Sequence, residues 1–255
     1  MSGAKKKKTS PAWLRAMGRN EPPDTFDVDG RTYTRVKTFK HDFFAATGLY
    51  ESDSGRAVLK IGRQASLLGV PMRWTGRFLF RRESRLLRKT QHLDGVPKLT
   101  GVWQDTGLVH DFIEGRPLMK NDALPDDFFP RLEKLIAEMH ALNIAYVDLE
   151  KRENVLVGDD GGPWLFDFQI AWDRSGWFVS RWILRILQKS DRYHLLKHWR
   201  RLRPDQLDEA RLRECESPPF WIAGHRLIFR PITRLRRHIL VWLGARTTAK
   251  GRSPG

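Results

Sequence analysis

Three polar residues at the ends of short apolar runs constrain this chain more than its composition does. Asp148 follows a segment with helical spacing, residues 128–142, in which apolar residues recur at intervals of three and four. Asn154 immediately precedes one short apolar β-run, and Asp167 immediately follows a second one. A Gly-Gly pair at 161–162 is typical of the turn between two such strands. The sequence therefore predicts a helix, a loop and a hairpin that bring these polar side chains together.

Two carboxylates and an amide in this order suit phosphoryl transfer from ATP. Asp148 is the candidate catalytic base, because a hydroxyl nucleophile needs a carboxylate within hydrogen-bond reach. Asn154 and Asp167 are candidate ligands of Mg²⁺, which prefers hard oxygen ligands, and Glu153 is an alternative to Asn154. The eight histidines lack the spacing of zinc ligands, so no zinc site is expected.

The N-terminal half of the chain has the pattern of an antiparallel sheet with one helix. Residues 78–93 have helical spacing and carry Glu83, and turn residues at 52–55 predict a hairpin whose second strand carries Lys60. The pair 114–115 (Glu-Gly) reads as a hinge. Before it we expect five strands: residues 31–39, 46–51, 56–61, 97–103 and 107–113.

These motifs resemble the catalytic and metal-binding loops of the protein-kinase-like superfamily, and the resemblance covers residues 30–175. It implies an α+β, two-lobed protein-kinase-like fold. The N-terminal lobe would be an antiparallel sheet with one helix, and the C-terminal lobe would be mainly helical. The resemblance also implies ATP and Mg²⁺ as cofactors.

The resemblance assigns further roles in the N-terminal half. Lys60 matches the strand lysine that steadies the α- and β-phosphates of ATP, and Glu83 matches the helix glutamate that pairs with it. Asp111 and Ile113 fall where such kinases present backbone groups to adenine. The implied nucleotide site therefore combines these four positions with the two metal ligands.

The chain departs from the superfamily pattern in its catalytic region. Asn154 lies six residues after Asp148 rather than five, and Val147 replaces an arginine that in many protein kinases pairs with an activation-loop phosphate. Gln169 replaces the glycine of the Asp-Phe-Gly pattern, and no Ala-Pro-Glu follows. A long peptide-binding activation segment is therefore not expected. In these respects the chain looks most like bacterial lipopolysaccharide and Kdo kinases and RIO-type kinases.

The segment that corresponds to the phosphate-covering loop is also unusual. Residues 40–48 contain one glycine where the family pattern has three. We expect backbone amides to cover the phosphates there, with help from Lys40 or His41.

Composition divides the chain into three regions: a flexible basic tail (1–24), an N-terminal lobe (25–113), and a C-terminal lobe with the catalytic loop and basic amphipathic C-terminal helices (114–255). The single cysteine, Cys215, excludes internal disulfides and fits a reducing cytosol. Arginines interrupt every long apolar stretch, so no spanning helix is expected. The expected location is the cytoplasm or, by peripheral contact, the inner face of a membrane.

The net charge of +16 is concentrated near the C-terminus. Residues 174–255 carry 19 Lys and Arg against 6 Asp and Glu, a net of +13. Arginines alternate with bulky apolar groups in residues 220–243, which favours contact with a membrane surface or an anionic substrate over a merely solvated basic surface. Residues 177–187 have a similar pattern, but there we expect a buried helix of the C-terminal lobe.

The sequence predicts an ATP- and Mg²⁺-dependent phosphotransferase. The acceptor would be a hydroxyl of a protein Ser/Thr or of a saccharide or lipopolysaccharide-type molecule, and the basic region favours an anionic, membrane-proximal one. The alternative is a pseudokinase or nucleotide-binding scaffold, which the sparse-glycine loop and the longer catalytic loop favour. Net charge alone suggests nucleic-acid binding, but no sequence-reading motif is present and no specific nucleic acid is expected.

Overall fold

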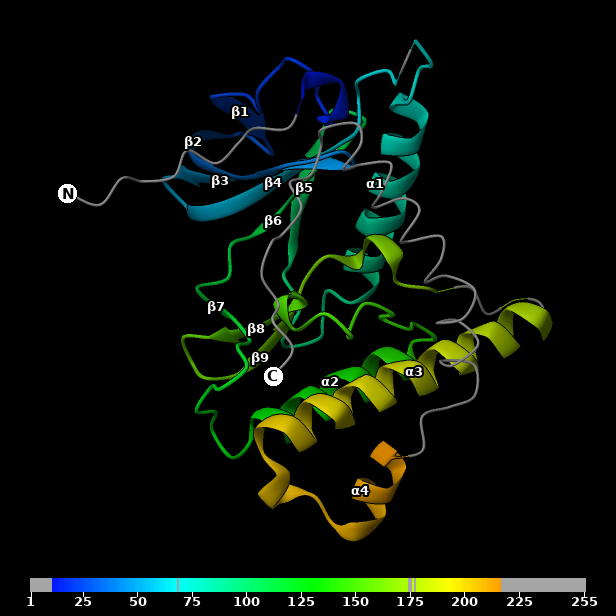
Figure 1. Ribbon diagram of the computed structural model, residues 1–255. Coiled ribbons are helices and arrows are strands. Elements are labelled where there is room, and N and C mark those ends of the chain that lie inside the picture. Colours follow the sequence, from blue (N-terminus) through cyan, green and yellow to red (C-terminus); the bar gives the residue numbers. More distant parts are fainter. Residues whose placement is uncertain (1–10, 68, 174–175, 177, 217–255) are drawn as a thin grey trace.

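Six antiparallel strands form the upper part of the computed structural model, which describes residues 11–67, 69–173, 176 and 178–216 (Figure 1). They pair in the order β1-β2-β3-β4-β6-β5. The expected hairpin is confirmed, because Ser52 and Gly55 pair across the turn. The strands are β1 (Thr25–Val28), β2 (Arg31–His41), β3 (Ala45–Ser52), β4 (Gly55–Gly62), β5 (Leu99–Trp103) and β6 (Gly107–Asp111).

One strand of this sheet was not expected from the sequence. β1 contributes Phe26 to an aromatic cluster, where its ring lies 5.0 Å from that of Tyr33 and 4.8 Å from that of Tyr50. All three side chains are buried. Burial of these rings, rather than an alternating pattern four residues long, explains why the short strand forms.

The helix α1 (Arg73–Lys89) packs against the sheet, through a contact between two glycines. A Cβ added at Gly62 of β4 would lie 2.9 Å from the carbonyl oxygen of Gly76, and one added at Gly76 would overlap the backbone of Arg63. The helix begins five residues before the expected start at 78. Phe78, the first residue of the segment expected to be helical, is 54% exposed despite its apolar side chain, and the buried face instead includes Phe80.

Helices make up most of the lower part of the molecule (Figure 1). α2 (Phe128–Ala141) runs beside α3 (Phe178–Leu202), and the rings of Phe129 and Trp199 stack 5.3 Å apart between them. α4 (Glu209–Glu216) follows α3. Between these helices and the large sheet lies a second, three-stranded antiparallel sheet, which consists of β7 (Gly115–Pro117), β8 (Val155–Gly158) and β9 (Pro163–Leu165).

Two expectations about the terminal regions differ from the structure, and a third lies outside the residues that it describes. Residues 11–24 are not a flexible tail: Leu14 and Ala16 are buried, and the N–H of Ala16 donates to the carbonyl oxygen of Asp42 at 2.6 Å. The first turns of α3 are not buried, since Trp182 is 61% exposed. The expected helices at 220–243 lie outside the described residues. Within the described helices, none is long and apolar enough to cross a membrane.

The close contact of the two glycines predicts a steric penalty. Substitution of Gly76→Ala pushes α1 away from β4, and overpacking of this kind costs about 1–3 kcal/mol. We expect the melting temperature to fall by about 2–4 °C for each kcal/mol. Gly176→Ala is the matched control, because a Cβ at Gly176 meets no atom within 4 Å. Equal melting temperatures of the two variants in calorimetry would refute the contact.

Candidate active site

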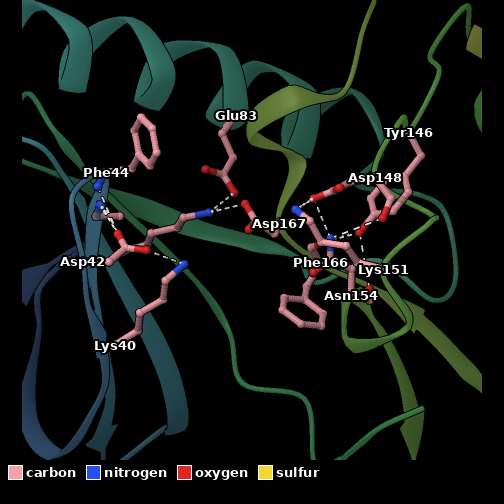
Figure 2. A network of polar contacts seen from close by, with 12 residues as sticks. Lys40, Asp42, Phe44, Glu83, Tyr146, Asp148, Lys151, Asn154, Phe166 and Asp167 are labelled. Atoms are coloured by element: carbon pink, nitrogen blue, oxygen red, sulfur yellow. Dashed lines mark hydrogen bonds and ion pairs between the residues drawn. The ribbon is translucent and has the colours of Figure 1, made fainter. Parts of the chain in front are cut away.

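The side chain of Lys60 lies between two carboxylates that come from distant parts of the chain. Its Nζ donates to Glu83 Oε1 of α1 at 2.8 Å and to Asp167 Oδ1, which follows β9, at 2.9 Å (Figure 2). The Lys60 side chain is 12% exposed and that of Glu83 is 5% exposed. A strand of the large sheet, its helix and the segment after β9 thus meet at one ammonium group.

Burial and charge oppose each other in this cluster. Burial alone would lower the pKa of Lys60, but the carboxylates of Glu83 and Asp167 outweigh it and raise the pKa, so the group stays an ammonium. Burial raises the pKa of Glu83, against the attraction of Lys60. Burial would also raise the pKa of Asp167, yet Lys60, with smaller effects from Lys40 and Lys151, lowers it. Asp167 is therefore a carboxylate at neutral pH.

Asp148 and Asn154 form a second polar pair. The Nδ2 of Asn154 donates to Asp148 Oδ2 at 2.7 Å, and the Nζ of Lys151 donates to the same oxygen at 2.6 Å (Figure 2). Two donors on one oxygen leave Oδ1 as the oxygen that can accept a further proton. Glu153, the alternative to Asn154, is exposed. The structure therefore favours Asn154 over Glu153 as the partner of Asp148.

A short turn accommodates the extra residue between Asp148 and Asn154. Residues Arg152–Asn154 form a single 3-10 turn, η2, whose end coincides with the start of β8. The turn leaves Asn154 buried beside Asp148, and the backbone N–H of Phe166 donates to the carbonyl oxygen of Asn154 at 3.4 Å. The six-residue spacing thus does not separate the two polar side chains.

A buried carboxylate on α3 holds the start of the catalytic loop. Asp191, at 0% exposure, accepts hydrogen bonds from the backbone N–H of Tyr146 at 2.7 Å and of Val147 at 2.8 Å. Val147 has φ = 72°, which is unfavourable for a β-branched residue. The two bonds compensate for that strain and hold the start of the loop against α3.

Sequence reasoning missed the role of Tyr146. Its hydroxyl donates to the carbonyl oxygen of Phe166 and lies 3.3 Å from the carbonyl oxygen of Asn154. Its ring meets that of Phe168 edge-on, with 5.3 Å between centroids. One buried side chain therefore ties the catalytic loop to the segment that carries Asp167. The only available signal was an aromatic residue two positions before Asp148, which by itself indicates no contact.

A cavity of about 450 Å³ opens beside Lys60. It brings together five of the expected site residues, whereas Asp148 and Asn154 are not among the residues that line it. In its wall the rings of Phe39 and Phe112 stack with 6.1 Å between centroids. The expected residues in the cavity wall are Lys60, Glu83, Asp111, Ile113 and Asp167.

His110 lies in the cavity wall beside the expected adenine contacts. Burial lowers the pKa of His110 to about 4, so its ring is neutral at pH 7. Its Nδ1 lies 2.8 Å from the carbonyl oxygen of Asp111, which places the ring hydrogen on that nitrogen. The carbonyl oxygen has two lone pairs and retains one for a base.

The donor set fits Mg²⁺. Asn154 turns its amide nitrogen to Asp148, which leaves its amide oxygen for a metal, and Asp167 uses Oδ1 for Lys60 and retains Oδ2. Mg²⁺ sites take one or two protein oxygens of this kind and complete the shell with phosphates and water.

Comparison with known proteins identifies the fold. No family model and no curated protein matches the chain. It is similar to the Rio2 kinase-ADP/Mg²⁺-phosphoaspartate complex from Chaetomium thermophilum, with a TM-score of 0.52 and 13% identity over 71% of this chain and 60% of that one. A second Rio2 kinase structure from that organism gives a TM-score of 0.49 and 13% identity over 68% and 59%.

The first of these likenesses confirms the expected two-lobed, protein-kinase-like α+β fold. The chain spans about three fifths of the length of the solved structures it matches. The resemblance to lipopolysaccharide and Kdo kinases stays a prediction.

The anchoring of the loop by Asp191 can be tested with Asp191→Asn. Asparagine has one carbonyl oxygen in place of two carboxylate oxygens, so its NH₂ group faces a backbone donor. We expect a loss of about 1.5–3 kcal/mol in the free energy of unfolding, measured in urea. Asp53→Asn, in the exposed β3–β4 turn, is the control and should change little. Equal stability of the two variants would show that Asp191 does not anchor the loop.

Proposed function

We propose that this protein is an ATP- and Mg²⁺-dependent phosphotransferase that transfers the γ-phosphoryl group to a hydroxyl. One observation carries the proposal. Lys60 donates to both Glu83 and Asp167, and Asn154 donates to Asp148 nearby, although these residues come from separate segments of the chain (Figure 2). A fold alone does not require this set of polar groups, whereas phosphoryl transfer does.

In the proposed reaction each group has one task. Asp148 accepts the proton of the acceptor hydroxyl on Oδ1, while Lys151 and Asn154 hold its other oxygen in place. Lys60 contacts the α- and β-phosphates, and Glu83 fixes the direction of its ammonium group. Mg²⁺, when bound by Asn154 and Asp167, neutralises charge on the phosphates.

The two lobes divide these tasks between them. In the proposal, residues 25–113 cover the nucleotide and residues 114–255 carry the catalytic loop. The backbone of Asp111 and Ile113 reads adenine in the cavity between them. The stacked rings of Phe39 and Phe112 in the cavity wall support this assignment, because aromatic and apolar walls suit a planar base.

The acceptor in this proposal is a hydroxyl of a protein Ser/Thr or of a saccharide or lipopolysaccharide-type molecule. The charge of the chain supports an anionic, membrane-proximal acceptor, since +13 of its +16 lies in residues 174–255. Contact would then be peripheral, at the inner face of the membrane, from the cytoplasm.

A second candidate is a pseudokinase that binds nucleotide without catalysis. The covering segment, residues 40–48, favours it, because its one glycine, Gly48, packs against another side chain. A Cβ there would lie 2.9 Å from a ring carbon of Tyr50. Binding of Mg-ATP with no transfer to any acceptor would support this candidate.

The two candidates are separated by Asp148→Asn. Loss of the base should slow phosphoryl transfer about 10²- to 10⁴-fold and leave ATP affinity nearly unchanged. The assay is transfer from labelled ATP to a panel of envelope glycolipids and proteins. Glu150→Gln is the matched control, since Glu150 is exposed in the same loop. If both variants transfer phosphate as fast as the parent protein, the assignment of the base fails.

A further inference from the structure

The turn over the cavity, residues 42–44 between β2 and β3, already contains an anion. The backbone N–H groups of Phe44 and Ala45 both donate to Asp42 Oδ1, each at 3.0 Å. The Nζ of Lys40 lies 2.8 Å from Asp42 Oδ2 (Figure 2). Two amides and an ammonium group are the donors that a nucleotide phosphate needs, and here a carboxylate occupies them.

The turn is held rigidly from behind by a buried arginine. Arg63, only 2% exposed, donates from Nη1 to the carbonyl oxygen of Phe43 and from Nη2 to that of Trp13, both at 3.0 Å. Its guanidinium also lies 4.1 Å from the centre of the Phe43 ring. The turn therefore cannot bend freely toward a ligand as a glycine-rich loop can.

Contacts with the N-terminal segment occupy both ring nitrogens of His41, so this residue is not available as a phosphate ligand. Its Nδ1 lies 2.7 Å from Nη2 of Arg15, and its Nε2 accepts a hydrogen bond from the N–H of Met17 at 3.2 Å. The His41 side chain is 7% exposed and engaged with the N-terminal segment. Of the two residues that the sequence suggested, only Lys40 remains.

Lys40 reaches the cavity because of a β-bulge. The register of β2 and β3 shifts between Thr38 and Lys40, so that Phe39 has no partner opposite. Side chains that follow one another on a strand normally point to opposite faces, but Phe39 and Lys40 both line the cavity. The Lys40 side chain is 59% exposed.

We propose that Lys40 is the phosphate ligand of this turn, and that Asp42 is an internal counter-anion from which the triphosphate takes the ammonium group. The proposal rests on the proposed function and names how its nucleotide is held. Exposed ion pairs contribute little to stability, so the Lys40–Asp42 pair separates at low cost. Asp42 keeps its two amide bonds, and the turn keeps its shape.

Two substitutions move ATP affinity in opposite directions. Lys40→Met removes the ammonium group and should weaken ATP binding about tenfold. Asp42→Asn keeps a carbonyl oxygen for the two amides but removes the competing charge, so ATP should bind about threefold more tightly. Neither substitution should change the affinity for adenosine, which has no phosphate.

The experiment is calorimetric titration of the full chain with Mg-ATP and with adenosine. Lys134→Met is the control, because it removes the same charge from an exposed position on α2 and should leave both affinities within about twofold. An unchanged ATP affinity in Lys40→Met, or a weaker one in Asp42→Asn, would overturn the proposal. Failure of the parent protein to bind ATP would instead overturn the proposed function.

Discussion

The ammonium group of Lys60 is the point on which the rest of the structure depends. A largely buried charge is tolerated only when it is paired, and its two partners come from α1 and from the segment after β9. One carboxylate would already balance the ammonium charge, so the second partner adds a link to another part of the chain. The bond from Lys60 to Glu83 holds α1 against the large sheet. The bond from Lys60 to Asp167 holds the sheet against the lower part of the molecule.

A second buried charge, the carboxylate of Asp191, also joins distant segments, in the lower part of the molecule. Asp191 accepts hydrogen bonds from the backbone N–H groups of Tyr146 and Val147, and His140 Nε2 lies 3.2 Å from its Oδ2. The loop that carries Asp148 is thus held by α3, some forty residues further along the chain. Its conformation depends on this contact and not on its own sequence alone.

Much of this arrangement is visible in the sequence, because the polar residues stand next to strands and helices with clear periodicity. Lys60, Glu83 and Asp167 were expected to converge, and they do. The features that the sequence does not predict have physical causes. β1 alternates over only four residues, which are too few to indicate a strand. Phe78 is an apolar residue on a helix that begins earlier than expected, and residues 11–24 pack largely through backbone bonds that leave no pattern. The roles of Tyr146 and Arg63 depend on contacts between distant segments, which spacing does not encode.

The glycine contact between α1 and β4 has a consequence for the position of Glu83. Because the backbone of Gly62 lies against that of Gly76, no side chain separates the helix from the strand at this point. Glu83 lies two turns further along the same helix, and Lys60 lies two residues before Gly62 on the same strand. Backbone packing, in addition to the ion pair itself, therefore sets the distance between the two charged groups.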